Sequence, residues 1–314
     1  MAYQILDYFA VKKLVIFGVG LIGGSAALAL KKAHFVTHIV GVGRSEKSLQ
    51  DALRLGVIDA SETNIRAACS DADLILIAAP VAQTANILRS IKPHLNAQTI
   101  ITDAGSTKGD VLACASEILG DQFGQFVGGH PIAGAEKSGV SAAKADLFLG
   151  KNVVLTPTLQ TNAPSHPLSN SLHAFDSPCS RALARVTQMW QTCGAKVSEM
   201  SAEKHDAIFA AVSHLPHLLA FALVNDIASR PNAAELFSFA ASGFRDFTRI
   251  AGSSPEMWRD ISLANKAALL NEITAFENEL SQLKQLLASE DSTGLQALFE
   301  RASVARNNWA NDKK

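Results

Sequence analysis

Charged residues are scarce in this sequence, and they carry almost no net charge. They make up 18% of the 314 positions, and 28 Lys and Arg residues are balanced by 29 Asp and Glu residues. An average soluble protein has about 25% charged residues. Without an excess of positive charge, neither nucleic acid nor an anionic membrane surface is an expected partner. The hydrophobic share of 48% requires more buried apolar surface than usual.

Cysteine is scarce as well, at four positions that stand far apart. No two of them form a Cys-x-x-Cys pair, which argues against a zinc knuckle or a disulfide framework and favours a reducing cytoplasm. One uncharged run, residues 14–30, superficially resembles a membrane span. It is shorter than the roughly 20 residues that a spanning helix needs, and glycines interrupt it. We therefore expect no membrane insertion there.

The first half of the chain alternates short β-branched runs with amphipathic stretches. This pattern is typical of a parallel sheet covered by helices. The expected strands are residues 14–17, 38–42, 74–79, 99–103, 126–127 and 152–156. The expected helices between them are residues 25–32, 46–55, 83–91 and 108–119. The pattern predicts an α/β fold with a Rossmann-type, doubly wound sheet.

The second half is mostly helical, apart from a strand expected at residues 196–200. Helices are expected at residues 202–229, 233–241 and 255–288. A stretch rich in Pro, Ser and Asn separates the two halves and indicates a loop. We therefore predict a dinucleotide-binding domain over residues 1–157, a linker over 158–178, a helical domain for substrate binding and dimerisation over 179–291, and a peripheral, frayed tail over 292–314.

A glycine-rich turn follows the first expected strand. Gly18, Gly20 and Gly23 form a G-x-G-x-x-G pattern between a strand and a helix, which is the context of a dinucleotide-binding fingerprint. Gly18 allows a tight turn, Gly20 lets a pyrophosphate approach, and Gly23 lets the helix pack closely on the strand. The helix that begins at Leu21 and Ile22 offers free N–H groups to the phosphates.

The second expected strand does not end in an acid. A carboxylate there would bind the ribose 2′-hydroxyl of NAD. The strand instead ends at Arg44 and Ser45, a cation and a hydroxyl donor that suit the 2′-phosphate of NADP. The alternative is that Arg44 is a solvated loop charge and that Glu46 binds the ribose. We favour NADP over NAD as the cofactor.

Two segments after later strands are candidates for the chemistry. In an open parallel sheet, ligands bind beyond the carboxyl ends of the strands. Ser106 lies in such a segment, residues 103–109, and His130 lies in another, residues 128–139. An imidazole can act as an acid or a base near neutral pH. The alternative for His130 is a structural histidine in a turn.

Several segments of the chain match one enzyme family, in the same order. They are residues 18–24, 103–109, 128–139, 205–217, 243–251 and 254–258, and the most specific are His-Pro-Ile-Ala-Gly from His130 and Phe-Arg-Asp-Phe-Thr-Arg-Ile-Ala from Phe244. The chain thus resembles the prephenate and arogenate dehydrogenases of tyrosine biosynthesis. The resemblance implies an NAD(P)-dependent oxidative decarboxylation of prephenate, arogenate or both, which yields 4-hydroxyphenylpyruvate or tyrosine. It also implies that His130 is the base for the substrate hydroxyl and that Ser106 holds His130.

The same resemblance implies an ionic network at the entrance of the pocket, formed by Glu136, Asp246 and Arg249. Arg249 would grip a substrate carboxylate with its forked guanidinium. The alternative is that Asp246 and Arg249 are a solvated pair three residues apart on a helix, worth only about 0.2–0.5 kcal/mol.

Histidines and a tryptophan complete the implied substrate pocket. By resemblance, His217 and His205 line the pocket, and Trp258 reaches it from the same subunit or from a neighbouring one. The alternative for Trp258 is an ordinary core residue, because a tryptophan buries a large area. His214 can equally be a structural histidine at a helix bend. We expect no metal, because Pro216 interrupts the helix between His214 and His217 and no cysteine completes a set of ligands.

Two other classes of protein are alternatives to this family. β-Hydroxyacid dehydrogenases and imine reductases share the architecture and use a lysine in the interdomain helix, where this chain has Lys204 beside His205. A non-catalytic nucleotide sensor would have lost the serine, the catalytic histidine or the arginine named above. All three are present.

Two helical stretches, residues 207–212 and 218–224, are apolar nearly all round. Helices of this kind are buried on every side. A helical domain of this size cannot bury them alone. We therefore predict an obligate, interlocked homodimer with an interface as apolar as a divided core.

Overall fold

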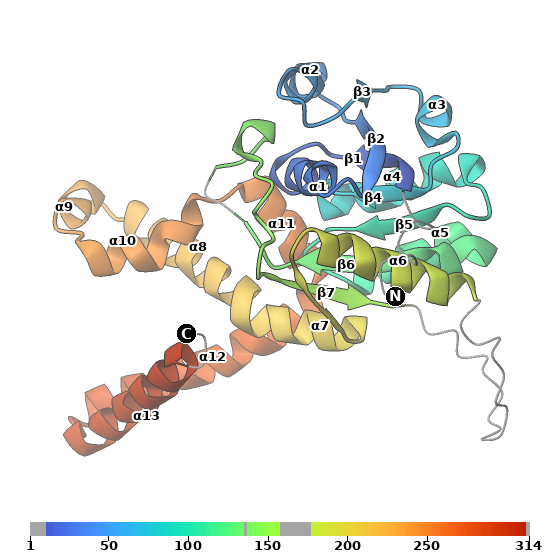
Figure 1. The fold of residues 1–314 in the computed structure, drawn as a ribbon. Coiled ribbons are helices and arrows are strands. Elements are labelled where there is room, and N and C mark those ends of the chain that lie inside the picture. The colour runs from blue at the N-terminus through green and yellow to red at the C-terminus, as the bar shows by residue number, and fades with distance from the viewer. Residues whose placement is uncertain (1–10, 135–136, 158–176, 312–314) are drawn as a thin grey trace, which may run out of the picture.

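The computed structural model describes residues 11–134, 137–157 and 177–311. These residues form a sheet with helices on both faces and a helical part that extends from it (Figure 1). The strand order of the sheet is β3-β2-β1-β4-β5-β6-β7-β8. The strands are β1 (Val11–Phe17), β2 (Val36–Val42), β3 (Ala60–Ser61), β4 (Leu74–Ile77), β5 (Ile100–Asp103), β6 (Phe126–Pro131), β7 (Asn152–Thr156) and β8 (Lys196–Glu199). The helices on the sheet are α1 (Leu21–Lys32), α2 (Glu46–Arg54), α3 (Ile65–Cys69), α4 (Thr84–Ile91), α5 (Gly109–Leu119) and α6 (Pro178–Thr192).

The prediction of a doubly wound sheet is confirmed. Strands β1 to β6 run parallel to one another. Successive residues of a strand point to opposite faces, so Leu14 and Ile16 pack against side chains of α1, α2 and α6. Val15 and Phe17 pack on the other face, against α3, α4 and α5. The sequences of these strands are hydrophobic at nearly every position because helices cover both faces of the sheet.

The predicted end of this domain at residue 157 is wrong. β7 turns antiparallel to β6, and β8 pairs with β7, so the sheet continues to Glu199. Val186 and Trp190 of α6 lie in the same hydrophobic core as the strands. Both α6 and β8 therefore belong to the sheet and not to the helical domain. Most of the predicted linker lies outside the described residues.

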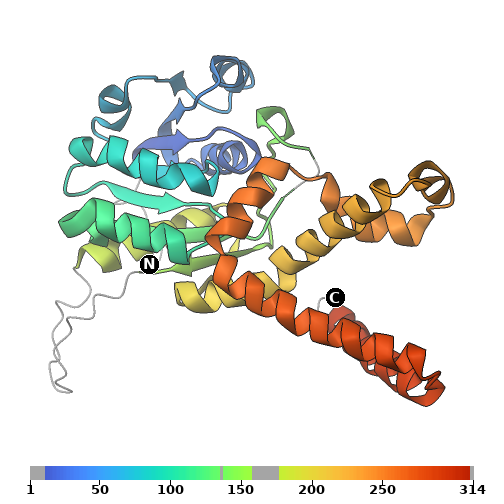
Figure 2. The same cartoon turned by 180° about the vertical axis from the view of Figure 1, so that it is seen from behind.

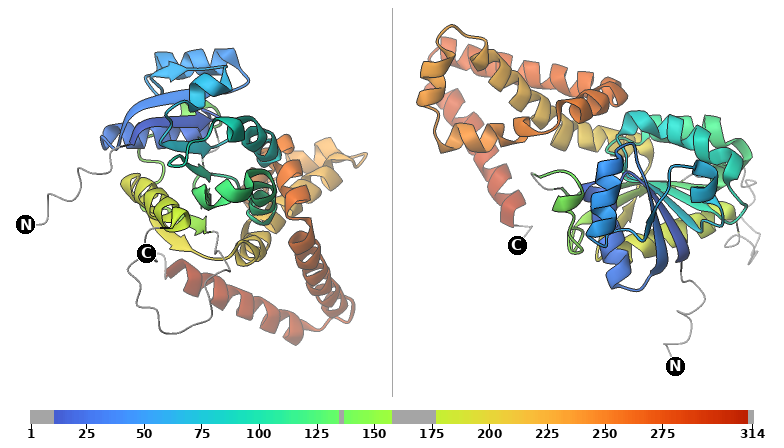
Figure 3. Two further views of the ribbon diagram at one scale, coloured as in Figure 1. Left: turned by 90° about the vertical axis from the view of Figure 1, so that its right-hand side faces the viewer. Right: turned by 90° about the horizontal axis from the view of Figure 1, so that it is seen from above.

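The helical part is built from one long helical run, a group of short helices and two long helices. These elements are α7 (Ala202–Phe209), the π-helix η7 (Ala210–His214), α8 (Leu215–Ala228), α9 (Ala233–Ser238), α10 (Ser242–Thr248), the 3-10 helix η8 (Arg249–Gly252), α11 (Pro255–Ala264), α12 (Lys266–Ala288) and α13 (Ser292–Asn311). The predicted frayed tail is wrong over residues 292–311, because α13 is a helix there. Figures 2 and 3 show α12 and α13 reaching away from the sheet.

The run from α7 to α8, Ala202–Ala228, is long and apolar enough to cross a membrane by length and composition. Its most apolar window has a mean hydropathy of 1.9, and only 28% of that window is buried. Further along the chain, α11 packs against the 3-10 helix η2 (Val81–Gln83), which follows β4. The helical part therefore meets the sheet at the carboxyl ends of its parallel strands, the edge at which such sheets bind ligands.

Candidate active site

The glycine-rich turn after β1 has the geometry that a phosphate-binding loop requires. Gly18 has a φ angle of 93°, and a Cβ there would lie 2.6 Å from the carbonyl oxygen of Ala78. A Cβ on Gly23 would lie 2.3 Å from the carbonyl oxygen of Gly18. Only glycine therefore allows α1 to lie this close to the turn. Around Gly20 the space is open, so a pyrophosphate can approach the backbone.

The N-terminus of α1 faces the same space. Its N-cap is Gly20, which has no side chain to cap the helix, and its first turn contains no acid. The first N–H groups, at Leu21, Ile22 and Gly23, therefore remain available at the positive end of the helix dipole. A phosphate group binds well at such a helix terminus.

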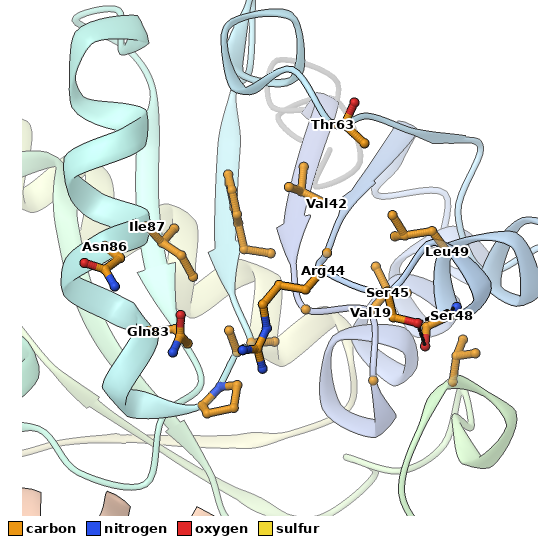
Figure 4. A pocket seen from close by; sticks show the side chains of 18 of the residues that line it. Val19, Val42, Arg44, Ser45, Ser48, Leu49, Thr63, Gln83, Asn86 and Ile87 are labelled. Atoms are coloured by element: carbon orange, nitrogen blue, oxygen red, sulfur yellow. Dashed lines mark hydrogen bonds between the residues drawn. The ribbon is translucent and has the colours of Figure 1, made fainter.

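A cavity of about 790 Å³ lies beside this turn, at the carboxyl ends of β1, β2 and β4 (Figure 4). Gly18 and Gly20 line it, and Arg44 points into it from the end of β2. Its hydroxyl groups include those of Ser45 and Thr63. No acidic side chain is among the described residues that line the cavity.

Ser45 also holds the helix that follows it. Its hydroxyl oxygen accepts a hydrogen bond from the backbone N–H of Ser48 at 3.2 Å and so caps α2. The side-chain hydroxyl of Ser48 lies 3.0 Å from the same oxygen and donates to it. With its oxygen used as an acceptor, Ser45 keeps its own O–H as a donor toward the cavity.

His130 lies at the end of β6 and contacts the helical part of the molecule. Its Nδ1 lies 2.8 Å from Nε2 of His205 on α7. Nδ1 of His205 in turn lies 2.7 Å from Oδ1 of Asp206. The ring of Phe209 packs edge-on against His130, with ring centroids 4.8 Å apart. Three polar side chains therefore form a row from the sheet into α7.

The carboxylate at the far end of this row is held by backbone groups. Asp206 accepts hydrogen bonds from the backbone N–H groups of Lys108, at 2.9 Å, and Gly109, at 2.8 Å. Both N–H groups belong to the start of α5, where a negative charge is favourable. The side-chain amide of Asn265 donates to the backbone carbonyl of Asp206 at 2.8 Å and to Nδ1 of His214 at 3.1 Å. Asp206 thus docks the helical part on the sheet.

A buried ion pair lies next to the row. The side chain of Lys108 is 0% exposed, and its ammonium pairs with the carboxylate of Asp103 at the end of β5. Asp103 also accepts hydrogen bonds from the backbone N–H groups of Gly105, at 2.7 Å, and Gly129, at 3.0 Å. The pair therefore ties the loop after β5 to the strand that carries His130.

The histidines of the site have low pKa values because they are removed from water. Burial lowers the pKa of His130 well below its ordinary value, and the nearby His205 and Lys108 lower it further. Burial also lowers the pKa of His205, although its hydrogen bond to Asp206 acts in the opposite direction. Burial brings the pKa of His214 down to about 4. All three imidazoles are therefore neutral at pH 7, and a neutral imidazole can accept a proton.

The other predicted pocket residues gather around α8, η8 and α11. His217 stacks on Trp258 of the same chain, with ring centroids 3.7 Å apart and ring planes 20° apart. Nδ1 of His217 donates to the backbone carbonyl of Ser213 at 2.9 Å. Burial lowers the pKa of His217, and the charge of Arg249 acts in the same direction. The structure therefore brings His217, Trp258 and Arg249 together.

Two predicted roles find different partners in the structure. His205 is 0% exposed and both of its ring nitrogens are engaged by other side chains, so its contact with substrate stays a prediction. The partner at Nδ1 of His130 is His205, where Ser106 was expected. The backbone of Ser106 instead lies close enough to His214 to act on its pKa.

The predicted ionic network is only partly described. Asp246 is exposed on α10, and Arg249 is exposed at the start of η8. Glu136, the third member, lies outside the described residues. The network therefore stays a prediction.

Sequence reasoning assigned no role to Asp206, Asn265, Lys108 or Asp103. The available signal was a histidine and an aspartate at the start of the most apolar run of the chain. Polar groups are buried in such a run only when they have hydrogen-bond partners. The partners themselves could not be read from the pattern.

Two family models match the chain. Residues 26–170 match the nucleotide-binding domain of prephenate dehydrogenase, and residues 201–301 match its dimerization domain. Prephenate dehydrogenase of Bacillus subtilis is 37% identical over 296 residues, which cover 94% of this chain and 75% of that protein. Cyclohexadienyl dehydrogenase of Zymomonas mobilis is 33% identical over 298 residues, which cover 94% of this chain and 95% of that protein.

Solved structures agree with these relatives. Prephenate dehydrogenase from Aquifex aeolicus, in complex with hydroxyphenyl propionate and NAD+, superimposes with a TM-score of 0.85 at 36% identity and covers 96% of this chain and 99% of that one. Arogenate dehydrogenase from Synechocystis superimposes with a TM-score of 0.75 at 27% identity and covers 95% and 99%. By sequence and fold, this chain belongs to the prephenate dehydrogenase family.

Proposed function

We propose that His130 is the base of the family's reaction in this chain, the NAD(P)-dependent oxidative decarboxylation of prephenate, arogenate or both. The observation that carries the proposal is a neutral imidazole at the carboxyl end of β6, on the same edge of the sheet as the cofactor cavity. A base must be unprotonated before it can accept the substrate's proton. The removal of His130 from water keeps it so at neutral pH.

The glycine turn, the free N–H groups of α1 and the adjoining cavity fit a nicotinamide dinucleotide. When bound, the dinucleotide would supply the acceptor for the hydride that leaves the carbinol carbon of the substrate. His130 takes the hydroxyl proton as the carbon–oxygen double bond forms. Carbon dioxide then leaves, its bonding electrons complete an aromatic ring, and His130 returns the proton to the phenolate oxygen. Aromatisation makes the reaction effectively irreversible, and His130 ends the cycle neutral.

Arg249 and His217 are the proposed ligands of the substrate's carboxylate and side chain. A guanidinium can grip a carboxylate with two parallel hydrogen bonds. The stacking of His217 on Trp258 gives the imidazole a fixed plane beside that cation. In this arrangement Trp258 acts within its own chain, as a wall of the pocket. Ser106, at the carboxyl end of β5, is proposed to approach the substrate hydroxyl.

NADP is the proposed cofactor in preference to NAD. Arg44, Ser45 and Thr63 offer a cation and hydroxyls at the place where the adenosine ribose of a dinucleotide lies in a Rossmann fold. Glu46, the alternative ligand for a free 2′-hydroxyl, is not among the described residues of the cavity lining.

The proposed assembly is a homodimer formed through the helical part. The match to a dimerization domain supports it. So do large hydrophobic side chains that a single chain leaves exposed, among them Val212 at 68%, Leu263 at 67% and Leu287 at 59%. A second chain would bury them in an interface as apolar as a domain core. A cytoplasmic location, favoured by the dispersed cysteines, belongs to the same proposal.

The purified chain tests the proposal when each of prephenate and arogenate is paired with each of NAD+ and NADP+. We expect reduction of at least one cofactor, seen as the near-ultraviolet absorbance of reduced nicotinamide, with release of carbon dioxide. No reduction with any pair would exclude dehydrogenase activity.

A β-hydroxyacid dehydrogenase or imine reductase is disfavoured, because Lys204 is exposed on α7 while its neighbours His205 and Asp206 face the site.

A further inference from the structure

We propose that His205 and Asp206 are positioning residues that fix the tautomer of His130 and share its charge when it accepts a proton. This inference rests on the function proposed above. It assigns a new role to two buried residues of the helical part.

The hydrogen bonds along the row leave only one assignment of protons. The carboxylate of Asp206 can only accept, so the hydrogen between it and His205 lies on Nδ1 of His205. Nε2 of the neutral His205 is then an acceptor. The hydrogen between the two imidazoles therefore lies on Nδ1 of His130. Nε2 of His130 therefore keeps a free lone pair. This nitrogen is the one that can accept a proton from the substrate.

The anchoring of Asp206 explains why this assignment is stable. Its two carboxylate oxygens accept the N–H groups of Lys108 and Gly109. An amide in this place would direct its NH₂ group at one N–H donor or at the imidazole. A carboxylate satisfies every partner without conflict. The carboxylate therefore specifies the direction of all the hydrogens in the row.

The surrounding charges make Asp206 the natural counterion of the row. The ammonium of Lys108 is paired with Asp103. Asp110 lies near Asp206, and burial raises its pKa. His214 is neutral, with a pKa of about 4. When Nε2 of His130 accepts the substrate's proton, the Nδ1 hydrogen of His130 can shift to Nε2 of His205, and the positive charge then lies next to the Asp206 carboxylate.

Substitutions at Asp206 and at His205 test the two parts of the role separately. Asp206→Asn removes the charge and lets the amide donate to Nδ1 of His205, which reverses the row and places a hydrogen on Nε2 of His130. We expect kcat to fall by about 10²-fold or more, within the range of general acid–base effects, with little change in KM. His205→Gln retains an acceptor for His130, whereas His205→Leu removes it. We expect His205→Gln to keep more activity than His205→Leu.

The pH profile distinguishes a positioning role from a structural one. The acid limb of kcat/KM reports the protonation of the base in the free enzyme. Without the Asp206 carboxylate, the cationic form of the row is less stable, so the acid limb of Asp206→Asn moves to lower pH. Asp226→Asn removes the same charge at an exposed position of α8 and should leave the limb in place. A loss of folding alone would lower the amount of active enzyme without moving the limb.

A measurement that needs no turnover tests the tautomer directly. In ¹⁵N-histidine-labelled wild-type protein we expect the His130 Nδ1 signal to be that of a protonated nitrogen and the Nε2 signal that of an unprotonated one. In folded Asp206→Asn the two should exchange. Unchanged signals and an unmoved acid limb in a folded, active variant would overturn the role of the row. If the wild type reduces no cofactor while its nitrogen signals are as expected, the proposed function fails and the tautomer assignment stands.

Discussion

At the scale of single residues, backbone N–H groups as well as side chains hold the two buried carboxylates of the site. Asp103 accepts the N–H groups of Gly105 and Gly129, and Asp206 accepts those at the start of α5. Backbone donors have no side-chain rotamers to lose when they bind. The two carboxylates are therefore held rigidly, as preorganised catalysis requires.

The substrate role of Arg249 predicts a specific kinetic change. We expect Arg249→Ala to raise KM by about 10- to 100-fold and to lower kcat much less, because a lost charge-assisted hydrogen bond costs about 1.5–3 kcal/mol of binding. Steady-state kinetics with the preferred substrate measure both constants. Arg245→Ala, an exposed arginine on α10, is the matched control. An unchanged KM would remove Arg249 from substrate binding.

The cofactor role of Arg44 predicts a change in selectivity. Arg44→Ala should weaken NADP+ by about 10- to 100-fold through the lost contact to the 2′-phosphate. The KM for NAD+ should change little, since NAD+ lacks that phosphate. Lys47→Ala removes an exposed charge nearby on α2 and should affect neither cofactor. Equal weakening of both cofactors would contradict a contact to the phosphate.

At the scale of elements, the run α7–η7–α8 organises the site. The π-helical turn η7 changes the register between α7, which carries His205 and Asp206, and α8, which carries His217. Such turns occur frequently at functional sites. Pro216 lies in the first turn of α8, where its missing N–H is tolerated. Pro216, which was expected to interrupt the helix, thus lies at the start of α8.

Gly20 and Gly23, at the start of α1, should respond differently to substitution by alanine. Gly23→Ala should destabilise the protein by about 1–3 kcal/mol, because its Cβ would lie 2.3 Å from a carbonyl oxygen. Gly20→Ala should leave the melting temperature nearly unchanged, since open space surrounds that position. It should instead weaken dinucleotide binding, because the methyl group occupies the approach of the pyrophosphate. Thermal unfolding and a binding titration separate the two effects, and equal melting temperatures would refute the distinction.

Elements with a strong local signal could be predicted from the sequence. The strands of the parallel sheet have β-branched runs and marked ends, and the glycine fingerprint identified the first turn. β3 has two residues, too few for a hydrophobic pattern. The polar end of the chain suggested fraying, but residues Ser292–Asn311 form the helix α13.

The candidate site could be predicted only as a set of residues, and not as a set of contacts. His130 and His205 are 75 positions apart, and their hydrogen bond depends on how the helical part docks on the sheet. Lys108 and Asp206 are separated by 98 positions. No periodicity reports such a pairing. The family resemblance named the histidines but not the hydrogen bonds between them.

At the scale of the whole molecule, the exposed apolar side chains of the helical part lead us to predict a homodimer. Leu287→Glu places a charge on an exposed apolar position of α12, and burial of an unpaired charge in an interface is costly. We expect sedimentation to show a dimer for the wild type at micromolar concentration and dissociation of the variant. Leu55→Glu, on a position of the sheet part that is 46% exposed, should remain dimeric. A monomeric wild type would refute the proposed interface.

The low burial of Ala202–Ala228 has a consequence for stability in dilute solution. If a second chain covers this helix, folding and association form one equilibrium. The free energy of unfolding then depends on the protein concentration. Each tenfold dilution then removes about 1.4 kcal/mol of stability per dimer. The melting temperature should rise with protein concentration. A cell that makes little of this protein would hold a less stable enzyme as well as fewer copies of it.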